Sequence, residues 1–88
     1  MALDFTGYES IPDHTKGALT RYVEHRLRPG SFLLAVLEGD LYNAVSYADS
    51  ANLAALGATT RFVCNRLPGN IWGSTATVWN YLNSYSED

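Results

Sequence analysis

Residues 31–48 read SFLLAVLEGDLYNAVSYA, and this stretch decides the fold. Its first part, Phe32 to Leu37, is apolar on every side of a helix for nearly two turns. A helix on the outside of a small bundle carries polar residues toward solvent, so we expect this segment to be covered from more than one direction. A single apolar stripe follows it, at Leu41, Ala44, Val45 and Ala48. We predict one helix from Ser31 to about Ala48.

Helical spacing continues on both sides of this stretch. Before it, Ser10-Ile11-Pro12-Asp13 is typical of a helix start, with Ser10 as the cap, and Arg28-Pro29-Gly30 ends the helix. After it, Asp49 caps a third helix that Pro68-Gly69 stops, and Ser74 or Thr75 caps a short fourth helix. The pattern predicts an all-α, single-domain bundle of about four helices.

The first ten residues lack this periodicity. We predict an extended N-terminal arm over residues 1–10, which contains Phe5 and Tyr8, and a helical domain over residues 11–88.

The composition points to association. The chain has 88 residues, of which 47% are hydrophobic and only 17% are charged. A globular protein usually has about 25% charged residues, and a domain this small buries a modest share of its surface. We therefore expect a homo-oligomer, and Phe32 to Leu37 is its predicted interface.

The bulk numbers also exclude several classes of protein. No apolar run is long enough to span a membrane. The net charge of -3 argues against a protein that binds DNA or RNA along the backbone, which needs a basic face. The single cysteine, Cys64, lies in an apolar helical context, so we expect a buried structural thiol in a cytosolic protein.

No catalytic pattern stands out. His14 and His25 are eleven residues apart, which places them at opposite ends of one helix, and no metal-binding or nucleophile motif is present. Glu38 and Asp40 flank Gly39 and are interpreted as solvated carboxylates. We expect a protein that is not an enzyme and that uses no cofactor or metal.

The basic residues are unevenly placed, since four of the six lie between Lys16 and Arg28. They form either a solvated face paired with nearby acids or a site for an anion, because guanidinium groups bind phosphate through two parallel hydrogen bonds. Arg61 and Arg66 point about 140° apart on their helix. A site shared by both within one chain is therefore not expected, although in a symmetric assembly either could meet its own copies.

Tyr8 likewise allows two interpretations. The ring either packs the arm onto the core or stacks on a nucleotide base, which contributes ~1–3 kcal/mol per stack.

Four motifs together resemble one family. Ile-Pro-x-His-Thr-x-x-Ala-Leu-x-x-Tyr-Val at Ile11 to Val23 and Pro-Gly-x-Phe-Leu-x-x-Val-Leu-x-x-Asp-Leu at Pro29 to Leu41 are similar to small proteins of tailed phages. So are Ala48-Asp49-x-x-Asn52 and Pro68-x-x-x-Trp72-Gly73-Ser74. Within that group, the chain resembles the anti-CBASS cyclic-oligonucleotide sponges over about residues 8 to 82.

The resemblance implies an all-helical homohexamer in the cytoplasm of a bacterial host. Such a protein sequesters cyclic dinucleotides such as 3′,3′-cGAMP, and cyclic trinucleotides, without cleaving them, so that CBASS effectors are not activated. Carried onto this sequence, Tyr8 is the residue that stacks on the dinucleotide base. Lys16 and Arg26 are the candidates for its phosphates, although the family is expected to use a lysine where Arg26 stands. Arg66, followed by Arg61, is the candidate for a separate trinucleotide pocket.

Two other functions compete with this one. The chain could be a small phage interaction protein whose apolar second helix docks on a host enzyme and inhibits it. A helix-turn-helix regulator is disfavoured, because the chain is acidic and lacks a recognition helix rich in arginine, lysine and asparagine.

Overall fold

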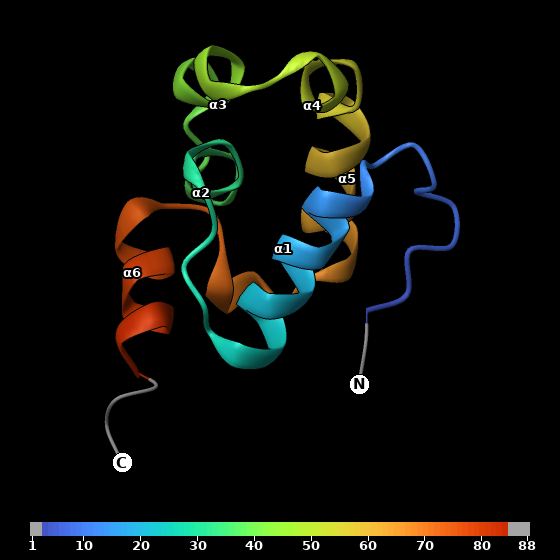
Figure 1. Ribbon diagram of the computed structural model, residues 1–88. Coiled ribbons are helices and arrows are strands. Elements are labelled where there is room, and N and C mark those ends of the chain that lie inside the picture. The colour runs from blue at the N-terminus through green and yellow to red at the C-terminus, as the bar shows by residue number, and fades with distance from the viewer. Residues whose placement is uncertain (1–2, 85–88) are drawn as a thin grey trace.

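A computed structural model of the protein describes residues 3–84, and this range folds into α-helices with one 3-10 helix (Figure 1). The predicted ends of the arm and of the helical domain, residues 1–2 and 85–88, lie outside the described range. The prediction of an all-helical single domain is confirmed, but residues 3–84 form six α-helices where about four were expected. The elements are α1 Asp13–His25, α2 Ser31–Glu38, α3 Leu41–Tyr47, α4 Ser50–Ala54, α5 Leu56–Arg66, η1 Gly69–Ile71 and α6 Thr75–Ser84.

The predicted helix over residues 31–48 is wrong, because the chain turns at Gly39. Gly39 takes a left-handed conformation (φ 79°), and the N–H of Asp40 reaches back to the carbonyl of Ala35 at 2.8 Å. This is a common way to end a helix, and glycine suits it because it has no Cβ. Asp40 then caps α3 by accepting from the Asn43 N–H at 3.2 Å.

The predicted third helix is also divided. Asp49 caps it as expected, since its carboxylate accepts from the Asn52 N–H at 2.8 Å. The helix then breaks at Ala55, whose backbone (φ -102°, ψ 13°) separates α4 from α5. Ala55 is buried, and the break gives the two short helices different directions (Figure 1).

The cap predicted at Ser10 is wrong as well. Pro12 precedes the first helical residue, Asp13, and no side chain caps this end. Of the two caps predicted for the last helix, Ser74 or Thr75, the structure shows Ser74, whose hydroxyl accepts from the Thr77 N–H at 3.1 Å.

Helix α2 lies at the centre of the molecule. It packs against α1, α3 and α6, and Phe32, Leu33, Ala35 and Leu37 are all buried. The coverage that the sequence predicts for this segment is therefore supplied within one chain. Phe32 to Leu37 is not a free face, so it no longer supports an interface between copies.

Cys64 is exposed, so the prediction of a buried thiol is wrong; it faces outward while its neighbour Val63 faces the core. None of the helices between residues 3 and 84 is long and apolar enough to cross a bilayer.

Tyr22 joins α1 to the last third of the chain. Its ring is fully buried, and its hydroxyl donates to the carbonyl of Ile71 at 2.7 Å. Burial raises the pKa of this hydroxyl far above its usual value, with smaller contributions from Tyr81 and Glu38.

We predict that Tyr22→Phe lowers the free energy of unfolding by about 1–3 kcal/mol, because the Ile71 carbonyl stays buried without its donor. Chemical denaturation at pH 7 measures this, and Tyr42→Phe, whose ring is 88% exposed, is the matched control. The neutral hydroxyl is favoured in the folded state, so its contribution is complete below the unfolded pKa of about 10 and is lost as the pH rises above that value. Tyr22→Phe therefore also removes part of the alkaline loss of stability.

A pair of glycine substitutions tests the turn that ends α2. Gly39→Ala forces a Cβ into a left-handed conformation, 3.4 Å from the Gly73 carbonyl oxygen, and we expect a loss of about 1–2 kcal/mol. Gly57→Ala on α5 meets no atom within 4 Å and should stabilise the protein by about 0.5 kcal/mol. Equal effects of the two variants in thermal denaturation would contradict the role of Gly39.

Candidate functional site

The N-terminal arm is a series of turns rather than the extended segment expected. The Asp4 carboxylate accepts from the N–H and the hydroxyl of Thr6, at 2.9 and 2.7 Å. The Glu9 carboxylate accepts from the Gly7 N–H at 2.9 Å. These hydrogen bonds lower the pKa of both carboxyl groups, since they favour the charged form. The carboxylates of Asp4 and Glu9 therefore accept hydrogen bonds from groups of the arm itself.

Aromatic rings attach the arm to α5. Phe5 stacks on the buried Phe62 with 4.6 Å between ring centroids, and Tyr8 meets the same ring edge-on at 5.2 Å. The Tyr8 hydroxyl accepts from the Asn65 side chain at 3.2 Å. Tyr8 thus packs the arm onto the core, the simpler of the two interpretations given above, while its ring remains partly exposed.

Arg66, the last residue of α5, also holds the arm. Its two terminal nitrogens donate to the backbone carbonyls of Asp4 and Thr6, both at 3.2 Å. Its guanidinium carbon lies 5.2 Å from the centroid of the Tyr8 ring. The planar guanidinium holds its two donors in a fixed geometry toward the two carbonyls, which the single ammonium group of a lysine would not do.

A hollow of about 340 Å³ lies between the arm and α5. Figure 1 shows the arm passing beside α1 and α5. We call this hollow the arm pocket, and it is lined by Thr6, Gly7, Tyr8, Ala58, Arg61 and Arg66. Arg61 and Arg66 were not expected to share a site, given their angle on the helix. They do so because the arm crosses the helix and Arg66 reaches toward it.

Arg61 differs from Arg66 in having no hydrogen-bond partner among the described residues. It is exposed, and within residues 3–84 it makes no hydrogen bond, ion pair or ring contact. All five N–H donors of its guanidinium are thus open to a ligand. The arm pocket therefore combines one fixed arginine, one free arginine and a tyrosine ring.

The other two predicted site residues lie elsewhere. Lys16 is 3.9 Å from the Asp13 carboxylate and 5.8 Å from the Phe5 centroid, outside the arm pocket. Arg26 lies against α6, where it donates to the Ser84 hydroxyl at 2.6 Å and covers the Tyr81 ring at 4.7 Å. One chain therefore does not bring Tyr8, Lys16 and Arg26 into one site.

A second polar cluster joins α1 to α4. The His14 Nε2 atom is 3.5 Å from the Asp49 carboxylate and 3.3 Å from the Asn52 amide nitrogen. Asn52 is buried, and its oxygen accepts from the Thr15 hydroxyl at 2.6 Å. These groups satisfy one another, which is a structural role. Among the described residues, no three metal-ligating side chains come together.

Comparisons with protein-family models, with curated protein sequences and with solved structures found no match to this chain.

We predict that Arg66→Ala releases the arm without unfolding the domain. Two hydrogen bonds from a charged group are lost at an exposed site, so the Thr6 and Tyr8 amides should exchange with solvent about tenfold faster. Hydrogen exchange followed by NMR measures this, with amides of α2 as the internal reference. Arg61→Ala is the control and should leave the exchange of the arm unchanged.

Proposed function

We propose that this protein binds and sequesters cyclic oligonucleotide second messengers without cleaving them. By doing so in the cytoplasm of a bacterial host, a phage protein would keep CBASS effectors inactive. The observation that carries the proposal is the arm pocket, because Arg61, whose guanidinium is unpaired, and the partly exposed Tyr8 both line it. A phosphate and a base are the two parts of a nucleotide that such groups recognise.

The proposal assigns different roles to the two arginines. Arg61 contacts the phosphate, because all its donors are free. Arg66 is a positioning residue, since it spends two donors on the arm carbonyls and covers part of the Tyr8 ring. The family resemblance implies the opposite order, with Arg66 before Arg61, and it implies a trinucleotide pocket separate from the Tyr8 site. The proposal instead uses one pocket, because Tyr8, Arg61 and Arg66 line the same hollow.

The size of the arm pocket bears on the ligand. Its volume of about 340 Å³ lies at the low end of the ~300–1,000 Å³ typical of small-molecule sites. It accommodates one nucleotide unit, so the rest of a cyclic di- or trinucleotide would extend beyond it. A homo-oligomer, proposed as a hexamer, would bring further copies of Tyr8, Lys16 and Arg26 to the remaining phosphates and bases.

The net charge of -3 is compatible with an anionic ligand. Charges are screened beyond about 8 Å at physiological salt, so the local arginines outweigh distant carboxylates. Within the arm, the Asp4 and Glu9 carboxylates are occupied by backbone N–H groups.

A second candidate function rests on α3. Its side chains Leu41, Tyr42, Val45 and Tyr47 are exposed, which suits a protein that docks on a host enzyme. The segment that the sequence predicts for docking, Phe32 to Leu37, lies inside the molecule, so this alternative now rests on α3.

Calorimetry with 3′,3′-cGAMP and with cyclic tri-adenylate tests the proposal. We expect binding in which Arg61→Ala weakens affinity by about tenfold or more, because hydrogen bonds to a charged group are lost. Arg21→Ala is the control, since that arginine is also exposed and lies on α1 outside the arm pocket. Tyr8→Leu keeps an apolar contact with Phe62 but removes the stacking face, and should weaken binding as well.

Three results would contradict the proposal. No heat with either nucleotide would end it and would favour the docking alternative. Linearised nucleotide recovered after denaturation would indicate an enzyme. Equal losses in Arg61→Ala and Arg21→Ala would mean that the arm pocket is not the site.

A further inference from the structure

The Tyr8 hydroxyl still has a hydrogen to donate. A phenol hydroxyl both accepts and donates hydrogen bonds. Its oxygen accepts from the Asn65 amide nitrogen at 3.2 Å, and no residue between positions 3 and 84 accepts its hydrogen. The bond from Asn65 therefore occupies the oxygen and leaves the hydrogen for a ligand.

Asn65 also holds this hydroxyl on the face of α5 that carries Arg61. The two residues are four positions apart on the helix, so they are neighbours one turn apart, with ~5–6 Å between their Cβ atoms. Tyr8 and Arg61 both line the arm pocket. Two donors of different kinds, a neutral hydroxyl and a charged guanidinium, are thus available to one ligand.

A phosphate is the acceptor that suits this pair of donors. A phosphodiester has two oxygens that share one negative charge, and a hydrogen bond to an ionised acceptor is stronger than one between neutral groups. The carboxylates of the arm do not compete for these donors. Asp4 already accepts from Thr6, and Glu9 accepts from Gly7. A phosphate in the arm pocket would therefore use the hydrogen of Tyr8 together with the donors of Arg61.

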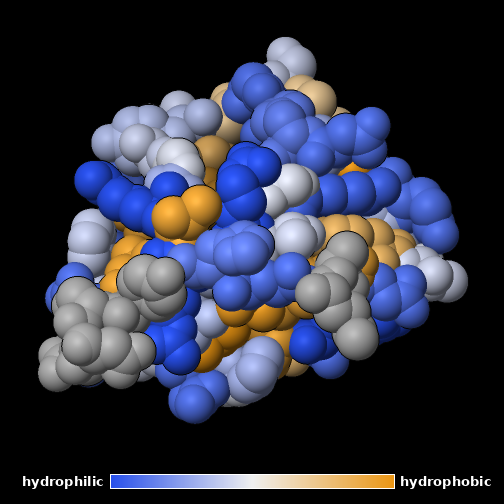
Figure 2. All heavy atoms as spheres, turned by 60° about the horizontal axis from the view of Figure 1, so that its bottom comes forward, coloured by the Kyte–Doolittle hydropathy of each residue, from blue (hydrophilic) through white to orange (hydrophobic). Residues whose placement is uncertain are grey.

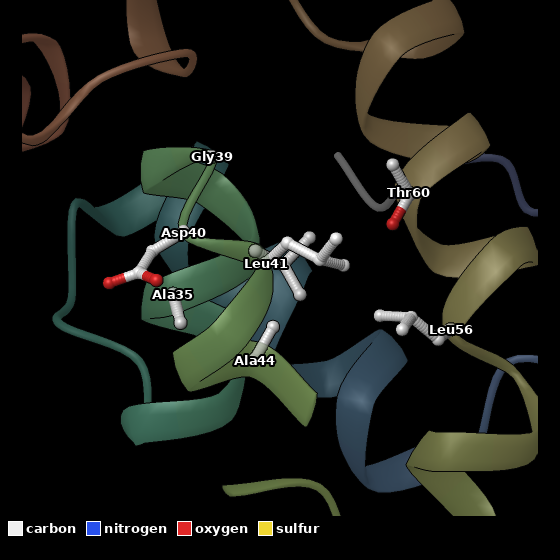
Figure 3. A pocket seen from close by; sticks show the side chains of 8 residues that line it. Ala35, Gly39, Asp40, Leu41, Ala44, Leu56 and Thr60 are labelled. Atoms are coloured by element: carbon white, nitrogen blue, oxygen red, sulfur yellow. The ribbon is translucent and has the colours of Figure 1, made fainter. Parts of the chain in front are cut away.

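The hollow between α3 and α5 differs from the arm pocket because no basic side chain lines it. It has a volume of about 130 Å³ and is lined by Ala35, Val36, Gly39, Asp40, Leu41, Ala44, Leu56 and Thr60. Figure 3 shows Leu41 pointing across the hollow toward Leu56 and Thr60. The Asp40 carboxylate points away from them and accepts from Asn43. This hollow therefore does not suit a phosphate.

The arginines at the bottom of Figure 1 already have partners. Figure 2 brings this end forward, and hydrophobic atoms are visible there as islands among hydrophilic ones. The guanidinium carbon of Arg26 is 4.7 Å from the centroid of the Tyr81 ring. That of Arg28 is 5.3 Å from the centroid of the Trp79 ring. Within residues 3–84, Arg61 makes no contact of this kind, so its guanidinium is more available to a ligand.

We propose that the Tyr8 hydroxyl donates to a phosphate oxygen of the bound nucleotide, next to Arg61, and that Asn65 directs its hydrogen there. This inference rests on the proposed function and deepens it, because stacking on a base uses the face of the Tyr8 ring and not its hydroxyl. Asn65 is a positioning residue, since it contacts Tyr8 and not the ligand. Tyr8 then recognises two parts of one nucleotide, the base with its ring and the phosphate with its hydroxyl.

Tyr8→Phe tests the hydroxyl, because it keeps the ring against Phe62. Calorimetry with 3′,3′-cGAMP should show an affinity about tenfold weaker, since one hydrogen bond to a charged group is lost. Tyr42→Phe is the matched control. It also loses only a hydroxyl, from a ring that is 88% exposed on α3 and does not line the arm pocket. Circular dichroism establishes that each variant is folded.

Two substitutions of Asn65 separate the direction of the hydroxyl from the attachment of the arm. In Asn65→Asp, the carboxylate accepts the Tyr8 hydrogen, so the arm stays attached but the donor is occupied. In Asn65→Ala, this attachment is lost and the hydroxyl is free to donate. We expect Asn65→Asp to weaken 3′,3′-cGAMP binding by about tenfold or more, and Asn65→Ala to weaken it less. A residue that only holds the arm would give the opposite order.

The charge added in Asn65→Asp is controlled for separately, because a carboxylate also repels a phosphate. The same substitution in the Tyr8→Phe protein adds the charge but has no hydroxyl to occupy. The loss of affinity caused by Asn65→Asp should therefore be about tenfold larger with Tyr8 present than in the Tyr8→Phe protein. Hydrogen exchange of the Thr6 and Tyr8 amides measures the attachment of the arm, and it should change more in Asn65→Ala than in Asn65→Asp.

The outcomes separate this inference from the proposed function. Protein that binds neither 3′,3′-cGAMP nor cyclic tri-adenylate would overturn both. Binding that Arg61→Ala weakens and Tyr8→Phe does not would overturn the role of the hydroxyl and leave the proposed function in place. Equal losses from Asn65→Asp in the two backgrounds would overturn the role of Asn65, since the added charge alone would then explain them.

Discussion

The chain reversal at Gly39 is the constraint on which the rest of the structure depends. Helix α2 is apolar all round, and a chain of this size can cover it only if the following residues turn back across it. The left-handed Gly39 permits that turn, and the N–H of Gly73 then donates to the Leu37 carbonyl at 2.8 Å. The end of α2 is thereby tied to the loop that precedes α6. The same turn leaves the apolar side chains of α3 on the outside.

The sequence was sufficient for the helical class and for the core but not for the breaks. Phe32 to Leu37 was correctly predicted to be covered, yet the cover was attributed to other copies, because periodicity does not show which helices pack together. Gly39 and Asp40 carried the signal for a helix end and a new cap, but the apolar stripe on both sides concealed it. Ala55 carried no signal at all, since an alanine breaks a helix only when packing requires it.

The candidate site was likewise predictable from the sequence only in part. Arg61, Arg66 and Tyr8 were each predicted as candidates, because arginine and aromatic side chains suit nucleotides. Their meeting in one pocket was not predictable, since it depends on the path of the arm. That path is set by two ring contacts, in which Phe5 and Tyr8 pack against Phe62. It is also set by the hydrogen bonds that Arg66 donates to two backbone carbonyls of the arm. The sequence does not show which backbone carbonyls accept hydrogen bonds from side chains. It therefore does not distinguish the arginine that holds the arm from the arginine that is free.

The net charge of -3 conceals a segregation of charge along the chain that matters for the proposed function. Positive charge is confined to residues 16–28 and to Arg61 and Arg66, and negative charge alone occupies residues 29–60. If the charges were evenly mixed along the chain, the net negative charge would weakly repel other copies of the protein. It would repel a phosphate in the same way. Segregated charges instead leave Arg61 and Arg66 on a helix without an acid, where they can attract a phosphate at short range. The low total of charged residues is therefore less informative than their separation along the chain.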